Sequence, residues 1–243
     1  MTSNPLLLLH GTGESSSCWD ALLDELGAQE RALRFDDLVT IEAVRAFAQS
    51  IPRGTHLVGH SYGGLLALDL ALRHSQRFSG LTLIEPVVFG VLRDFDDEAL
   101  RPVEEVAAQF ARSDDPAELE KCLEALLDYW FGLGTWAQGS DRLRRRMRNE
   151  AELAGAQVIH ASTYRPTDEV LGSLDLPTSI IAGTASTAAA QGIAHYLGQA
   201  MPRASLHLVS GARHDLIRSH AGAIASLMTD SWTDLPVPQG GGG

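Results

Sequence analysis

The stretch 57–64 constrains the fold of this chain more than any other part of its sequence. It joins an apolar run at 55–58, which predicts a buried strand, to a helical pattern rich in leucine and alanine. Between them lies the pattern G-x-S-x-G, formed by Gly59, Ser61 and Gly63. A strand that turns sharply into a helix strains the backbone of its turn residue, and flanking glycines let the two segments approach. We therefore predict that Ser61 projects beyond the strand as a nucleophile, although a tight structural turn would leave the same pattern.

Composition narrows the class of protein. The chain has 243 residues, of which 44% are hydrophobic, and its formal net charge is -12. That charge repels nucleic acids and anionic membrane surfaces, so we expect neither as a partner. No stretch reaches the roughly 20 apolar residues of a membrane span, and residues 1–9 lack the basic start of a signal peptide. Two distant cysteines, Cys18 and Cys122, fit a reducing compartment. We expect a cytoplasmic protein that acts on a small molecule, and the sequence leaves its oligomeric state open.

Strand and helix patterns alternate along most of the chain. Six segments predict strands, at 6–9, 32–35, 55–58, 81–84, 178–182 and 205–209. Strands that alternate with helices predict an α/β fold, in which a mostly parallel sheet of about six strands is flanked by helices on both faces.

The middle of the chain departs from this alternation. From residue 87 to residue 174 the strand signal disappears, and helical patterns occupy 97–111, 116–129 and 140–156. We expect this segment to form a helical cap inserted into the fold. The predicted division is therefore a core made of 1–86 and 175–234, a cap at 87–174, and a disordered tail at 235–243.

Several polar residues follow directly after predicted strands: Thr12, Ser61, Glu85, Thr184 and His214. Ligands of parallel α/β sheets bind outside the carboxyl ends of the strands. We therefore expect these residues to share one edge of the sheet, although they are scattered over the whole chain.

Three segments, at 8–11, 58–64 and 211–214, together resemble the α/β-hydrolase superfamily. The resemblance implies that Ser61 is a nucleophile, that His214 is its base, and that the backbone amides of Thr12 and Tyr62 form an oxyanion hole. It also implies a serine hydrolase of the esterase type, which cleaves a small and largely apolar ester through an acyl-enzyme without a cofactor.

The acid partner of His214 departs from the usual family pattern. The acid usually follows the strand that here ends at Gly183, but residues 184–187 contain no carboxylate. A histidine base needs such a partner to fix its tautomer. Some α/β-hydrolases, among them the haloalkane dehalogenases, place the acid after the strand next to the nucleophile strand, which here ends at Glu85. We predict Glu85 as the acid. It can instead be a buried structural carboxylate, and the other candidates are Asp168, Glu169, Asp175 and Asp215.

Aromatic and basic residues gather within the predicted cap. We predict that Trp130 and Trp136 line the substrate pocket, whereas the alternative is that they form the core of the cap. Five arginines, between 142 and 148, lie on one helical segment. They indicate either a solvated helix face or a site that attracts an anionic substrate. The histidines His195, His207 and His220 show no metal-ligand spacing, so we predict no metal site.

Two alternative functions remain open from the sequence. A lyase or cyclase on the same fold is one, because the carboxylate is missing from its usual place. A non-catalytic ligand receptor is the other, although the presence of both Ser61 and His214 favours an enzyme.

Overall fold

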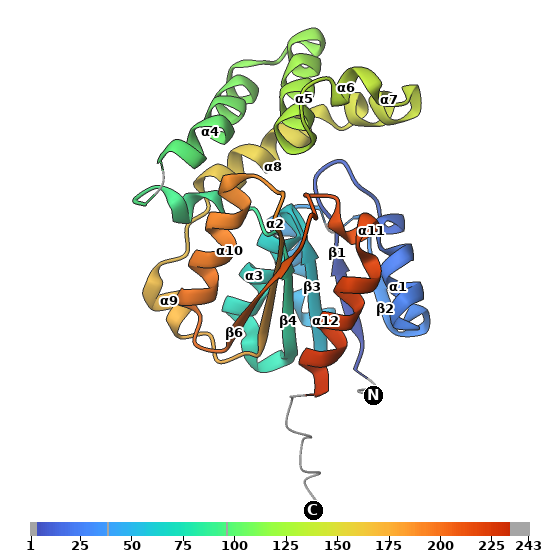
Figure 1. Ribbon diagram of the computed structural model, residues 1–243, viewed down its shortest axis with the longest axis vertical. Coiled ribbons are helices and arrows are strands. Elements are labelled where there is room, and N and C mark those ends of the chain that lie inside the picture. The colour runs from blue at the N-terminus through green and yellow to red at the C-terminus, as the bar shows by residue number, and fades with distance from the viewer. Residues whose placement is uncertain (1–3, 38, 96, 234–243) are drawn as a thin grey trace, which may run out of the picture.

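The computed structural model describes residues 4–37, 39–95 and 97–233. It consists of one sheet with helices on both faces, and a further group of helices above the sheet (Figure 1). The predicted disordered tail, 235–243, lies outside the described residues.

The sheet has six strands in the order β2-β1-β3-β4-β5-β6, and all neighbouring pairs are parallel. The strands are β1 (Leu6–Leu9), β2 (Ala32–Arg34), β3 (Thr55–His60), β4 (Phe78–Ile84), β5 (Thr178–Gly183) and β6 (Ala204–Val209). The predicted α/β fold with about six parallel strands is therefore confirmed. His60 pairs with Ile84 at the ends of β3 and β4. The residues that follow them, Ser61 and Glu85, therefore lie at the same end of the sheet.

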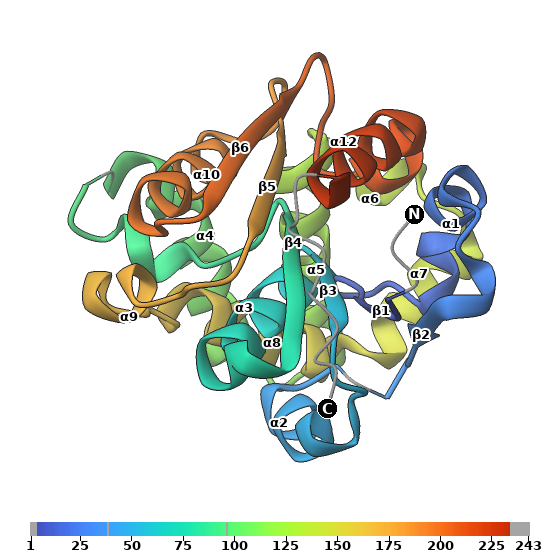
Figure 2. The same ribbon diagram turned by 90° about the horizontal axis from the view of Figure 1, so that it is seen from below.

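Helices cover both faces of this sheet, as Figure 2 shows from below. One face carries α2 (Ile41–Phe47), α3 (Tyr62–His74) and α10 (Ala188–Ala200), and the other carries α1 (Asp20–Leu26), α11 (Leu216–Ser219) and α12 (Ala221–Thr233). Coverage on both sides explains why β1 and β3 are buried along their whole length. Continuous apolar runs are typical of such parallel strands.

Local sequence signals set the ends of several helices. The Thr40 hydroxyl accepts a hydrogen bond from the Ala43 amide at the start of α2, and Asp115 caps α5 in the same way. These residues satisfy amides that have no partner inside the helix. Short 3-10 helices connect the main elements: η1 (Ser16–Trp19), η2 (Gln29–Arg31), η3 (Ala48–Ser50), η4 (Ser75–Arg77) and η5 (Phe89–Leu92).

The segment between β4 and β5 is helical. It contains α4 (Asp97–Arg112), α5 (Pro116–Phe131), α6 (Thr135–Gln138), α7 (Asp141–Asn149), α8 (Ala151–Thr163) and α9 (Asp168–Gly172). Helices α4 to α8 lie above the carboxyl ends of the strands, and we call them the cap helices (Figure 1). Helix α9 instead packs against α10.

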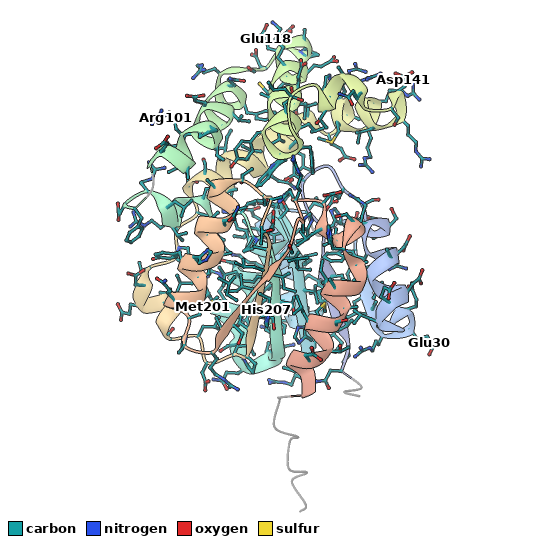
Figure 3. All side chains as sticks on the ribbon, in the orientation of Figure 1. Glu30, Arg101, Glu118, Asp141, Met201 and His207 are labelled. Carbon is teal, nitrogen blue, oxygen red and sulfur yellow. The ribbon has the colours of Figure 1, made fainter. Side chains whose placement is uncertain are left out.

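The cap helices have an apolar core of their own, which includes Phe110, Leu123, Trp136 and Ala154. Charged side chains such as Arg101, Glu118 and Asp141 lie at the outer surface of these helices (Figure 3). The prediction of a single helix at 140–156 is wrong, because the helix is interrupted at Glu150, where φ is -109° and ψ is 12°. A 3.6-residue pattern continues across such a short break, which is why the sequence did not reveal it.

Cys18 and Cys122 are both free and buried. Cys18 packs beside the sheet with α1, whereas Cys122 packs inside the cap. Among the described residues, no helix is both long enough and apolar enough to cross a bilayer.

Candidate active site

Ser61 lies at a strained turn between β3 and α3. Its φ is 55° and its ψ is -122°, a backbone conformation that residues other than glycine seldom adopt. A Cβ on Gly59 would come within 2.3 Å of the Gly63 carbonyl oxygen, and one on Gly63 within 1.9 Å of the Leu9 carbonyl oxygen. Only glycine fits at these two positions, so the G-x-S-x-G pattern is a steric requirement of this turn.

Three side chains that are remote in the sequence meet at this turn. His214 Nε2 lies 2.9 Å from Ser61 Oγ, and His214 Nδ1 lies 2.7 Å from Glu85 Oε2. All three residues are buried. Since an ionised carboxylate only accepts hydrogen bonds, Nδ1 donates to Glu85, and Nε2 is left to accept the Ser61 proton. The arrangement is that of a nucleophile, a base and a carboxylate that orients the base.

Glu85 accepts hydrogen bonds from residues 183–186, the segment at the end of β5 in which related proteins usually carry the acid. Its Oε1 accepts the Gly183 amide at 2.8 Å, and its Oε2 accepts the Ser186 hydroxyl at 2.7 Å. Burial acts to raise the pKa of Glu85, but hydrogen bonding to His214 and these two donors lowers it overall. The carboxylate is therefore ionised at neutral pH and available to the imidazole.

Two of the other candidate carboxylates have partners of their own. Asp175 pairs with Arg203 at 3.2 Å, and Asp168 accepts a hydrogen bond from the Tyr196 hydroxyl. Asp215 lines the cavity described below. Of the candidate acids, the structure brings Glu85 to His214 Nδ1.

The environment of His214 keeps its imidazole neutral. Burial is the largest effect and lowers its pKa below the ordinary value, while the hydrogen bond to Glu85 opposes this change. A neutral imidazole is the form that can take a proton from a serine hydroxyl.

Thr12 and Tyr62 lie near Ser61. Both line the same cavity as Ser61. Tyr62 is the first residue of α3, and amides in the first turn of a helix have no partner inside it. The loop after β1 passes so close that a Cβ on Gly11 would lie 2.9 Å from Ser61 Cβ. The predicted oxyanion-hole residues are thus brought to Ser61 from the loop after β1 and from the first turn of α3.

A cavity of about 230 Å³ opens next to Ser61. Its walls are largely apolar, and the cap and the segment after β4 supply side chains such as Val87, Phe89, Val103, Leu126, Met147 and Val158.

The two tryptophans predicted for the pocket occupy different places. Trp130 lines the cavity and stacks on His214, with ring centroids 3.6 Å apart and an interplanar angle of 10°. Trp136 does not line this cavity; it is 5% exposed and packs in the apolar core of the cap. The pocket prediction for Trp136 is therefore corrected, because α6 turns its indole between the cap helices.

The arginines of α7 divide in the same way. Arg144 pairs with Asp141, and Arg148 pairs with Glu120, both on the outside of the cap. Arg146 instead lines the cavity and donates to the Gly13 carbonyl oxygen. The sequence left open whether these arginines form a solvated helix face or attract an anionic substrate. Arg144 and Arg148 fit the first interpretation, whereas Arg146 faces the cavity.

Sequence reasoning missed two residues of this site, Glu14 and His60. Both line the cavity, and they form a hydrogen bond with each other. Their positions in the sequence could have indicated that they lie near Ser61, since Glu14 belongs to the loop after β1 and His60 directly precedes Ser61. Within residues 4–37, 39–95 and 97–233 there is no group of three or more His, Cys, Asp or Glu side chains suited to a metal ion.

Comparison with known proteins agrees with this architecture. A model of the "Alpha/beta hydrolase family" matches residues 6–227. A pimeloyl-(acyl-carrier protein) methyl ester esterase of Yersinia enterocolitica is 24% identical, over 93% of this chain and 92% of the relative.

Solved structures show the same fold. The enol-lactonase of Burkholderia xenovorans LB400 superposes with a TM-score of 0.70 at 20% identity, covering 96% of this chain and 93% of the other. MGS-M2, an alpha/beta hydrolase from a Medee basin deep-sea metagenome library, gives a TM-score of 0.75 at 14% identity, covering 99% and 93%.

Proposed function

Because the chain belongs to the alpha/beta hydrolase family, we propose that it is a serine esterase with Ser61 as its nucleophile. The observation that carries this proposal is the continuous hydrogen-bonded series from Ser61 through His214 to Glu85, with distances of 2.9 Å and 2.7 Å. Similarity to an esterase along nearly the whole chain supports the same reaction class.

In the proposed reaction, Ser61 Oγ attacks the ester carbonyl carbon and passes its proton to His214 Nε2. The carbonyl oxygen becomes an oxyanion, and the backbone amides of Thr12 and Tyr62 stabilise it. When the oxyanion collapses, the alcohol leaves with the proton from His214. Water then attacks the acyl-enzyme with His214 as base, which releases the carboxylic acid and restores Ser61.

We propose that the substrate is an ester with a small, largely apolar acyl group. The apolar cavity walls next to Ser61 support this choice, since burying apolar surface favours binding by about 25 cal/mol per Å². Trp130 lines the cavity and stacks on His214, so it adds a further apolar surface beside the proposed base.

A fluorophosphonate probe tests the proposed nucleophile directly. We expect one covalent adduct on the folded protein, which peptide mass spectrometry locates at Ser61. The labelled protein is then compared with unlabelled protein on esters of graded acyl length. Absence of an adduct on folded protein, or an adduct on another residue, contradicts the proposal.

The pH dependence of the reaction follows from the burial of His214. The base acts when neutral, so kcat/KM rises with pH through the pKa of His214 in the free enzyme. Since this pKa is lowered from 6.5, we expect the rise to be centred below pH 6.5. A series of kcat/KM values for an uncharged ester measures it. A midpoint at or above 6.5 contradicts the expectation.

The lyase or cyclase alternative was favoured by the missing carboxylate after β5. The hydrogen bonds that Glu85 accepts from His214 and Ser186 support hydrolysis instead, since they offer a carboxylate from the end of β4 in its place. We therefore retain ester hydrolysis as the single proposed function.

A further inference from the structure

A second carboxylate and imidazole lie beside the proposed catalytic residues, and no step of the proposed reaction uses them. Glu14 Oε2 lies 3.0 Å from His60 Nδ1, and His60 Nε2 lies 2.8 Å from the carbonyl oxygen of His214. The side chains are well buried, with exposures of 13% for Glu14 and 4% for His60. Buried ionisable groups are costly unless they are paired, so this pair calls for an explanation.

The partners of His60 determine where its protons lie. A backbone carbonyl can only accept a hydrogen bond, so His60 Nε2 carries a proton and donates to it. Glu14 is surrounded by donors, because Oε2 also accepts the Gly11 amide at 3.0 Å and Oε1 pairs with Arg218 at 2.9 Å. A carboxylate in such surroundings is ionised and accepts only, so His60 Nδ1 donates as well. With both nitrogens protonated, the ring is an imidazolium.

This ion pair connects the loop after β1, the end of β3 and the loop after β6. Glu14 holds the Gly11 amide, which directly precedes Thr12 in the loop after β1. His60 directly precedes Ser61, and it holds the main chain of His214 in the loop after β6. The His60 and His214 rings are 4.9 Å apart. The oxyanion loop, the nucleophile and the base are thus connected through one buried contact.

We propose that Glu14 and a protonated His60 are positioning residues, which hold the Thr12 amide and the His214 imidazole in register with Ser61. This proposal rests on the proposed esterase function, because the register matters only if these groups act together. A displacement of about 1 Å in such an arrangement costs on the order of 100-fold in rate.

The electrostatics agree with this assignment. Burial opposes the charge on His60, but the adjacent Glu14 carboxylate raises its pKa above the ordinary value overall. The pKa of Glu14 is held below its usual range, since the contacts with His60, Arg218 and the Gly11 amide outweigh its burial. The charge on His60 also helps to lower the pKa of His214.

Nitrogen-15 NMR of the histidine rings tests the charge on His60 in the wild-type protein. We expect both ring nitrogens of His60 to show protonated shifts at about pH 6.5, where an ordinary histidine is about half deprotonated. The signals are assigned by their loss in His60→Gln. A ring that is mainly neutral at this pH overturns the proposal. The measurement needs no activity, so it is decisive even if a Glu14 variant fails to fold.

The variant Glu14→Gln tests the positioning role. The two carboxylate oxygens face three donors, which are His60, the Gly11 amide and Arg218. Replacing one oxygen with an NH₂ group places this new donor next to a donor that it cannot bind. We expect His60 to become neutral, and both kcat and the rate of Ser61 labelling to fall about 10- to 100-fold. Glu30→Gln is the matched control, because Glu30 is exposed and distant from the site. A folded Glu14→Gln protein with wild-type kcat overturns the proposal.

The two proposals fail in different ways. If wild-type protein is not labelled at Ser61, the esterase function is contradicted whatever the state of His60. If Ser61 is labelled and esters are hydrolysed, but His60 is neutral, the positioning role alone is contradicted.

Discussion

Ser61→Ala is expected to reduce kcat for ester hydrolysis by about 10⁶-fold while leaving the protein folded. The hydroxyl is the only part of the side chain removed, and the alanine methyl group occupies the place of the serine Cβ. The loss is large because no acyl-enzyme can form. Ester hydrolysis measured beside circular dichroism distinguishes lost chemistry from lost structure.

The matched control for this substitution is Ser226→Ala on α12, where the exposed hydroxyl donates to the Gly222 carbonyl oxygen. We expect this variant to retain full activity. If Ser61→Ala keeps more than a small fraction of the wild-type kcat, the reaction does not pass through Ser61.

Glu85→Gln is expected to reduce kcat by about 10⁴-fold, the effect of replacing the carboxylate of a Ser-His-Asp triad with an amide. The amide matches the carboxylate in shape, but it can present an NH₂ group to His214 Nδ1. The imidazole then adopts the tautomer with the proton on Nε2, so it cannot accept the Ser61 proton. Single-turnover release of the alcohol measures this step.

Asp175→Asn provides the comparison for Glu85→Gln, because Asp175 precedes β5 and pairs with Arg203 away from the site. We expect it to leave kcat unchanged. A folded Glu85→Gln protein with near-wild-type turnover would reduce Glu85 to a structural carboxylate, which was the alternative interpretation of the sequence.

The meeting of Ser61, Glu85 and His214 could be predicted because each follows a strand. In a parallel sheet all carboxyl ends lie at one edge, so position after a strand is enough to bring distant residues together. The pairing of His60 with Ile84 adds that β3 and β4 end level. From the sequence, Glu85 was chosen because it follows the strand next to that of Ser61, where the haloalkane dehalogenases place their acid.

The roles of the cap side chains could not be predicted in this way. Trp130 and Trp136 are both aromatic residues on helices with apolar neighbours, yet one stacks on His214 and the other packs inside the cap. The rotation of a helix about its axis is set by the helices packed against it, and the sequence pattern of a cap is apolar on more than one side. The contact between Glu14 and His60 escaped prediction for a related reason, since the two residues are distant in sequence.

Ser61 and Glu85 share a backbone feature with a cost of its own. Among the described residues, they are the two residues other than glycine with positive φ, at 55° and 43°. Each such conformation costs about 1–3 kcal/mol relative to a relaxed backbone. Glycine would adopt either conformation without that penalty but would bring no functional group. The strained backbone at these two positions therefore lowers the free energy of unfolding. Replacing either residue with glycine would relieve the strain and raise heat stability, but it would remove the hydroxyl or the carboxylate that activity requires.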